Sequence, residues 1–146
     1  MRKGSYIKIY VFGFLFFLYS CANNQETVKV DFTNSFCDGN SKVWMVNAIY
    51  QGNELIQTRN EFKSKVFVFY KTGRFVYGNL VHLFENSNEG GNFLLESDSN
   101  YLELQFLKKK WTFIFEFKDE NNLILRPEKS SPSHLTFELI PFPDPL

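Results

Sequence analysis

The sequence predicts an all-β protein: an eight-stranded antiparallel up-and-down meander that closes into a small barrel. From Lys42 onward, apolar residues often alternate with polar ones at a period of two. Clusters of Gly, Asn, Asp and Ser interrupt this pattern roughly every 8 to 12 residues, as turns between short strands do. No stretch of useful length has a helical period. Eight strands in this order are enough to close a barrel, which removes the exposed edges of an open sheet.

The individual strands follow from the alternation and from the turns. The clearest strand is 111–118, whose four aromatic residues stand at alternate positions and therefore share one face. The segment 71–73 predicts a tight hairpin with Gly73 in the left-handed conformation, and the polar segments 98–100 and 119–122 predict further turns. The segment 86–92 predicts a longer loop. The expected strands are 42–50, 64–71, 74–84, 92–97, 101–107, 111–118, 122–127 and 134–140.

The first 21 residues predict an export signal and a lipid anchor. A positive start at Arg2 and Lys3 precedes the apolar run 9–18, and the small residue Ser20 stands directly before Cys21. This order resembles a bacterial lipoprotein signal peptide. The resemblance implies that Cys21 becomes the acylated N-terminus and attaches the protein to a membrane. Because the apolar run is shorter than the roughly 18 to 20 residues that span hydrocarbon, we expect an anchored chain and no spanning helix.

The residues that follow Cys21 bear on the destination. The residue directly after Cys21 is Ala22. An Asp at that position would resemble an inner-membrane retention signal of some bacteria, so we expect an outer-membrane location. The absence of an acidic run there favours the periplasmic face over the cell surface. The chain then divides into a signal peptide (1–20), a lipidated N-terminus with linker (21–41) and a barrel domain (42–146). Within the linker, the polar stretch 31–40 is a candidate lid, tether or short helix, with Phe32 and Phe36 as a candidate plug.

Composition excludes some partners and supports a single packed domain. Removal of the signal peptide leaves 13 basic residues of the original 16 against 16 acidic ones, so the mature chain is mildly acidic. Nucleic acid is therefore not expected as a partner. The one basic cluster, Lys108-Lys109-Lys110, is expected to be a solvated hairpin tip. If Cys21 is acylated, Cys37 has no partner in the chain and is either a small buried residue or an intermolecular site, of which we expect the buried thiol.

Residues 42–140 resemble the short lipocalin-like domains of Bacteroidota-type lipoproteins. The matching features are Lys42-Val43-Trp44 at the start of the first strand, the Phe-rich hairpin 66–77, and the strand 111–117 followed by Asn122-Leu123-Ile124-Leu125. The resemblance implies a barrel of this type. In true lipocalins an arginine of the last strand stacks on the tryptophan, and here Arg126 in the preceding strand is the candidate substitute.

An eight-stranded barrel is either filled by its own side chains or holds one small ligand, and the sequence leaves both alternatives open. We expect a binding module for a small apolar ligand inside the barrel, with aromatic and aliphatic walls and a polar contact from Asn47 or Arg126. The alternative is a structural or assembly protein that docks another envelope protein through an outer apolar strip at 66–77. The candidate ligand-binding residues are Trp44, Val46, Asn47, Tyr77, Phe113, Phe115 and Arg126.

No residue pattern predicts catalysis, a metal or a cofactor. His82 and His134 stand far apart in the sequence, with no further His or Cys at the spacing of metal ligands. Ser133 and Cys37 supply nucleophile types without a surrounding catalytic motif. We therefore expect a non-enzymatic protein.

Overall fold

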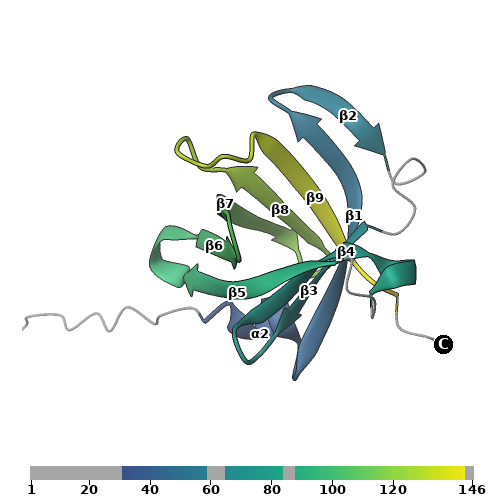
Figure 1. The fold of residues 1–146 in the computed structure, drawn as a ribbon, viewed down its shortest axis with the longest axis vertical. Helices are drawn as coiled ribbons and strands as arrows, with labels where there is room; N and C mark the ends of the chain where they lie inside the picture. Colours follow the sequence, from purple (N-terminus) through teal and green to yellow (C-terminus); the bar gives the residue numbers. More distant parts are fainter. Residues whose placement is uncertain (1–30, 59–64, 84–87, 144–146) are drawn as a thin grey trace, which may run out of the picture.

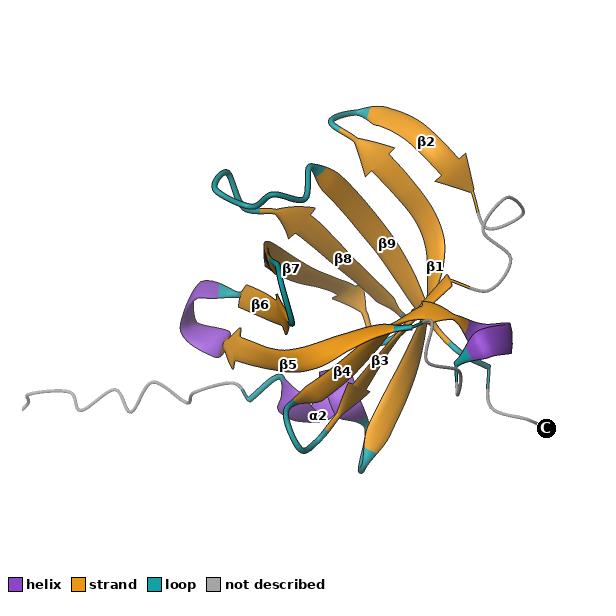
Figure 2. Ribbon diagram, in the orientation of Figure 1, coloured by secondary structure: helices purple, strands orange, loops and turns teal. Residues whose placement is uncertain are grey.

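A computed structural model describes residues 31–58, 65–83 and 88–143. In this part of the chain strands predominate, with short helical segments between or before them (Figure 2). The helix is α2 (Thr33–Cys37), and two 3-10 turns are η1 (Leu80–His82) and η2 (Ser97–Ser99). The strands are β1 (Ser41–Gln51), β2 (Glu54–Thr58), β3 (Lys65–Tyr70), β4 (Arg74–Asn79), β5 (Glu89–Glu96), β6 (Tyr101–Phe106), β7 (Lys110–Asp119), β8 (Asn122–Pro127) and β9 (Leu135–Pro141).

The strands form a closed antiparallel barrel. β1 pairs with β3, and each strand from β3 to β8 pairs with the next one along the chain. β9 returns to pair with β1, so that eight strands close the sheet (Figure 1). This arrangement confirms the predicted all-β up-and-down barrel. The ninth strand, β2, is an addition that the sequence did not predict.

The extra strand β2 shares one edge of β1 with β3. The first part of β1 pairs with β3, where Ser41 faces Tyr70, and the last part pairs with β2, where Gln51 faces Glu54. The register between β1 and β2 shifts by one residue, which leaves Ile56 without a partner on β1. Figure 1 shows β2 beside the end of β1 that lies far from α2.

The boundaries of β4 and β5 differ from the predicted ones for local reasons. The predicted strand 74–84 ends at Asn79, whose side chain accepts a hydrogen bond from Val81 N and begins the 3-10 turn η1. Gly90 and Gly91 belong to β5, not to a loop. A Cβ on Gly91 would lie 1.8 Å from the carbonyl oxygen of Gln105, so only glycine fits where β5 and β6 approach so closely.

The predicted turns are confirmed. Gly73 has a φ of +81° and its N–H donates to the carbonyl of Tyr70 at 2.9 Å, which closes the β3–β4 hairpin. Asn100 is left-handed with a φ of 51° and ends the β5–β6 connection. In the β7–β8 turn, the Asp119 carboxylate accepts from Asn121 N at 2.7 Å.

The interior is the predicted face of alternating apolar residues. All four aromatic residues of β7 lie in the core or pack against it, as do the alternate apolar residues of β6, β8 and β9. The buried cluster consists of Phe36, Cys37, Trp44, Val46, Ile49, Phe67, Phe69, Phe75, Leu102, Leu104, Phe113, Phe115, Leu123, Leu125, Phe137 and Leu139. This cluster and all the strand pairings described lie within residues 31–143.

The helix α2 closes one end of the barrel. Phe36 is fully buried and packs edge-on against Phe69 and Phe115, with ring centroids 5.2 and 5.1 Å away. The indole N–H of Trp44 donates to the carbonyl of Phe36 at 3.1 Å, which ties the helix to β1. Residues 31–40 therefore form the short helix and the plug that the sequence offered among its alternatives. Residues 1–30, with the predicted signal peptide and Cys21, lie outside the described part of the chain.

Cys37, also in α2, is buried and belongs to the core cluster, which confirms the expected buried thiol. Burial raises the pKa of this thiol because the thiolate loses its hydration there. We therefore expect Cys37 to be poorly reactive in the folded protein.

Candidate functional site

Four of the predicted ligand-binding residues lie together in the barrel interior. Trp44, Val46, Phe113 and Phe115 are each at most 2% exposed. All four belong to the same buried cluster. Their predicted inward orientation is confirmed, and they contact neighbouring core side chains.

Aromatic rings fill the space between strands that are not neighbours in the sheet. Phe137 of β9 lies 5.4 Å from Phe67 of β3 and 5.9 Å from Phe113 of β7, measured between ring centroids. Phe69 of β3 meets Phe93 of β5 at 5.2 Å. Such contacts across the barrel place side chains where an enclosed ligand would have to sit.

The two polar candidates, Asn47 and Arg126, do not meet inside the barrel. Asn47 is half-buried at the place where the register between β1 and β9 shifts. Arg126 is exposed and forms an ion pair with Glu116 on the outer face. The hydrogen bond and the charge of Arg126 lower the pKa of the Glu116 carboxyl. The cation that lies over the Trp44 ring is not Arg126 but Lys42, whose amine is 4.4 Å from the ring centroid.

The seventh candidate, Tyr77, lies at the barrel end far from α2, within a group of aromatic side chains. We call Tyr77, Phe106 and Trp111 the mouth cluster. The Trp111 ring is 5.6 Å from Tyr77 and 4.7 Å from Phe106. All three residues are partly buried and pack against the core. The mouth cluster is therefore an apolar surface continuous with the interior.

Two lysines cover the mouth cluster. The Lys109 amine lies 4.8 Å from the Phe106 centroid and 4.7 Å from the Trp111 centroid, and the Lys65 amine lies 5.5 Å from the Tyr77 centroid. The Glu89 carboxylate meets the Lys109 amine at 2.5 Å. Burial, and then the negative charge of Glu89, raise the pKa of the Tyr77 hydroxyl.

Sequence reasoning missed the roles of Lys109, Glu89 and Phe106. Residues 107–109 form the hairpin tip between β6 and β7, as predicted, but Lys109 folds back over the rings. Nothing in a run of three lysines indicates which side chain does so. A strand predicted to begin at Glu89 would have placed this carboxylate near Phe106, because Gly91 of β5 pairs with Phe106 of β6. The sequence predicts a loop at 86–92 instead, and a loop gives no such position.

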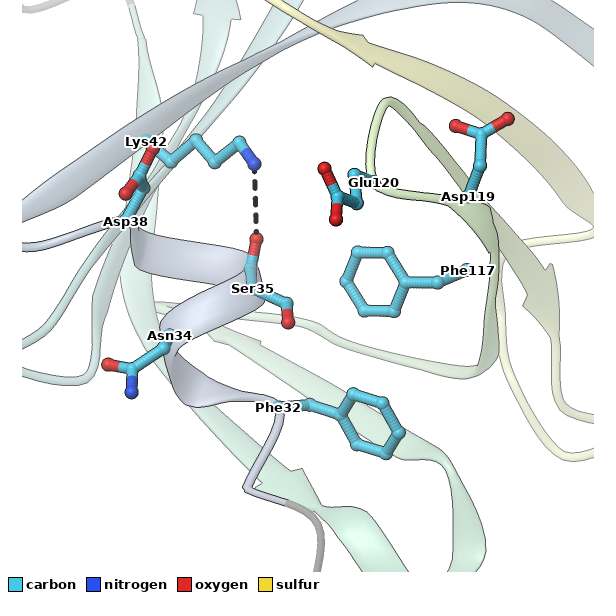
Figure 3. A pocket seen from close by; sticks show the side chains of 8 residues that line it. All are labelled: Phe32, Asn34, Ser35, Asp38, Lys42, Phe117, Asp119 and Glu120. Atoms are coloured by element: carbon cyan, nitrogen blue, oxygen red, sulfur yellow. Dashed lines mark hydrogen bonds between the residues drawn. The ribbon is translucent and has the colours of Figure 1, made fainter.

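A groove lies at the opposite end of the barrel, between α2 and the β7–β8 turn (Figure 3). Its volume is about 570 Å³ and it opens widely to solvent. The rings of Phe32 and Phe117 stack at 5.8 Å beside it, and the Lys42 amine donates to the Ser35 carbonyl at 3.4 Å. The lining residues are Phe32, Asn34, Ser35, Asp38, Lys42, Phe117, Asp119 and Glu120.

Two charged side chains of this groove, Asp119 and Lys42, are engaged within the protein. The Asp119 carboxylate accepts hydrogen bonds from the Asn122 amide at 2.7 and 2.8 Å and from Asn121 N, which lower its pKa. Lys42 covers Trp44. The groove is a surface depression, and its wall residue Phe117 packs against fully buried Phe36 of the core cluster at 5.3 Å between ring centroids.

The outer apolar strip expected at 66–77 is largely covered. Val66 and Val68, on the outward face of β3, are 0% and 2% exposed. Exposed apolar side chains lie at several other places, and two of them are neighbours on β2, where Leu55 is 48% and Ile56 is 42% exposed.

Within residues 31–58, 65–83 and 88–143, no three His, Cys, Asp or Glu side chains are grouped so as to hold a metal ion. In the same ranges, no helix has the length and apolarity that a membrane crossing requires.

Comparisons with protein-family models, with curated proteins and with solved structures find no match for this chain.

Proposed function

We propose that the protein is a lipid-anchored, non-catalytic binding module of the cell envelope, and that it takes a small apolar or amphipathic ligand at the mouth cluster. In this proposal Cys21 carries the anchor, in the outer membrane and facing the periplasm. The observation that carries the proposal is the aromatic surface of the mouth cluster. It is continuous with the core, and the hairpin lysine Lys109 lies over its Phe106 and Trp111 rings.

The mouth of a barrel is a common position for a ligand site, because the core below supplies a rigid apolar floor. The mouth cluster has such a floor in Phe67, which lies 4.6 Å from Tyr77, and in Phe113 and Phe137, each 6.3 Å from Trp111. Opening it requires the movement of lysine side chains. Opening the helix end requires the removal of buried Phe36, which is far more costly.

The proposal is tested with a neutral apolar fluorescent probe, N-phenyl-1-naphthylamine, and the protein produced without residues 1–21. We expect saturable binding that Phe106→Glu abolishes, because a carboxylate would enter the apolar site. Phe32→Glu is the matched control, since Phe32 is also a partly buried phenylalanine at a barrel end. Equal loss of binding in both variants, or binding that never saturates, would contradict the proposed site.

The anchor is tested in cells that incorporate labelled palmitate. We expect the full chain to become labelled and to fractionate with membranes. Cys21→Ser should remain unprocessed and unlabelled, while Cys37→Ser, which changes the buried thiol, should be labelled as the unchanged protein is. Label that persists in Cys21→Ser would refute the anchor.

A second candidate function is assembly with another envelope protein, and β2 is the observation that favours it. In the described part of the chain, β2 pairs with β1 on one edge and with no strand on its other edge. The β2 side chains Leu55 and Ile56 are exposed. A free strand edge is a template for pairing with another chain. A photo-crosslinker at Leu55 should then yield one discrete adduct in cells, whereas one at Leu107, which is 93% exposed on a hairpin tip, should not. Identical products at both positions would count against assembly through β2.

A further inference from the structure

The mouth cluster already holds an ammonium group, and the contacts of that group indicate what the site recognises. The Lys109 amine lies under 5 Å from two ring centroids, at 4.8 Å from Phe106 and 4.7 Å from Trp111. A cation within about 6 Å of an aromatic centroid is attracted by the negative face of the ring. Two rings that share one cation form part of an aromatic cage.

A carboxylate completes this arrangement. Glu89 meets the same Lys109 amine at 2.5 Å, and it stands on β5 opposite Tyr77 of β4. The rings and the carboxylate therefore surround one positive charge from different strands. Both charged side chains of the pair are partly exposed, at 41% for Lys109 and 50% for Glu89, so solvent and a ligand can reach them.

The neighbouring lysines at this end of the barrel make contacts other than those of Lys109. Lys65 lies over Tyr77, on the far side of the mouth cluster from Phe106. Lys110, next to Lys109 in the chain, pairs with Glu103 at 3.1 Å. Lys109 is thus the cation that lies over both Phe106 and Trp111, and its replacement by a ligand leaves the Glu89 carboxylate available.

We infer that Phe106, Trp111 and Glu89 form an ammonium-binding site that Lys109 occupies in the free protein, and that the ligand is an amphiphile with a quaternary ammonium head. This inference rests on the proposed function and names its ligand class. The ligand head replaces the Lys109 amine over the two rings and beside Glu89, while the apolar tail covers the rest of the mouth cluster. Because Lys109 competes from within the same chain, it lowers the apparent affinity for the ligand.

The inference predicts an unusual response to the removal of a positive charge. Lys109→Met keeps the length of the side chain and removes its amine. We expect this variant to bind a trimethylammonium amphiphile about fivefold more tightly, because the Lys109 contacts that compete with the ligand are partly exposed and therefore modest in strength. Adding Glu89→Gln should abolish most of that gain. An anionic ligand would respond oppositely, since Lys109→Met would remove its counter-charge.

The test uses three amphiphiles with the same ten-carbon tail, below the concentrations at which they form micelles: decyltrimethylammonium, decyl glucoside and decyl sulfate. Each is titrated into the protein produced without residues 1–21, and the indole N–H resonances are followed by NMR. Trp111 reports the site. Trp44, whose indole N–H donates a hydrogen bond to the Phe36 carbonyl at the other end, reports that the fold is intact. Lys110→Met is the matched control for charge removal.

The outcomes separate the two proposals. A selective Trp111 shift with decyltrimethylammonium, strengthened by Lys109→Met but not by Lys110→Met, supports the ammonium site. Equal binding of the three amphiphiles, or preference for decyl sulfate weakened by Lys109→Met, overturns the ammonium inference and leaves the proposed binding function standing. If no amphiphile shifts Trp111 in any folded variant, both proposals fail.

Discussion

The two ends of this barrel are closed in different ways. At the helix end, α2 places fully buried Phe36 against core rings and receives a hydrogen bond from Trp44. At the other end, the partly buried rings of the mouth cluster lie under lysine amines. One closure is part of the core, and the other consists of side chains in contact with solvent.

This difference indicates which end can admit a ligand. Withdrawing a buried aromatic side chain costs several kcal/mol, about 3 to 5 by comparison with truncation in protein cores. A partly exposed ion pair and its ring contacts are worth about 1 kcal/mol or less. We therefore expect the lysine end to open within the native state, and the helix end to open only at a much higher cost.

The largest predicted effect concerns the helix end. Phe36→Ala should lower the free energy of unfolding by about 3 to 5 kcal/mol, because it leaves a cavity between α2 and the strands. Urea denaturation measures this loss. Phe106→Ala at the other end is the matched change, and we expect a clearly smaller loss because Phe106 is only partly buried. Equal losses would remove the distinction between the two closures.

A smaller effect is expected from the hydrogen bond that holds α2. Trp44→Phe keeps an aromatic ring but leaves the Phe36 carbonyl without the indole donor. We expect a loss of about 1 to 3 kcal/mol in unfolding free energy, the usual cost of a buried acceptor that loses its partner. Ring volume also falls, so Trp111→Phe serves as the control. The comparison fails if Trp111→Phe is the more destabilising change.

Removing the lysine cover should change access more than stability. Lys109→Ala should alter the unfolding free energy by less than about 1 kcal/mol, because the Lys109–Glu89 pair is partly exposed. The same change should increase the quenching of Trp111 fluorescence by acrylamide. Lys42→Ala, at the other end, should leave Trp44 protected, since α2 still covers it. Unchanged quenching in Lys109→Ala would show that this lysine does not cover the site.

The smallest predicted effect is a pH dependence at the mouth cluster. The pKa of Tyr77 is raised in the folded protein by burial and by Glu89. In the unfolded chain a tyrosine ionises near pH 10, so the stability linked to Tyr77 is fully present below about pH 10 and is lost as the pH rises through the higher folded value. Urea denaturation between about pH 9 and 11 should show a steeper decline for the unchanged protein than for Tyr77→Phe. Identical declines would mean that Tyr77 is not buried as described.

Most of the barrel could be predicted from the sequence because a strand with one dry face shows its burial as alternation. The strand 111–118 and its neighbours show this pattern plainly. The strand β2 could not be predicted in this way, since it is short, exposed on most of its length and interrupted by the register shift at Ile56. The sequence predicts a loop at Gly90 and Gly91, because the close approach of neighbouring strands that requires glycine there is a tertiary contact.

The candidate site was less predictable than the fold. Alternation identified Trp44, Val46, Phe113 and Phe115 as inward-facing, which their burial confirms, but it does not reveal whether an interior is filled. The position of Lys109 over the rings depends on where one flexible side chain turns at a hairpin tip, and its partner Glu89 is distant in the sequence. Such contacts follow from tertiary structure alone.

Hydrogen exchange at the two indole N–H groups, followed in one sample of the folded protein, compares the two barrel ends within one experiment. The Trp44 indole is buried and its N–H is hydrogen-bonded to the Phe36 carbonyl, whereas Trp111 lies at the lysine-covered end. We expect Trp44 to exchange only through openings that withdraw α2 from the core, while Trp111 exchanges orders of magnitude faster through local opening. Equal exchange at the two indoles, or faster exchange at Trp44, would show that the two ends do not differ in this way.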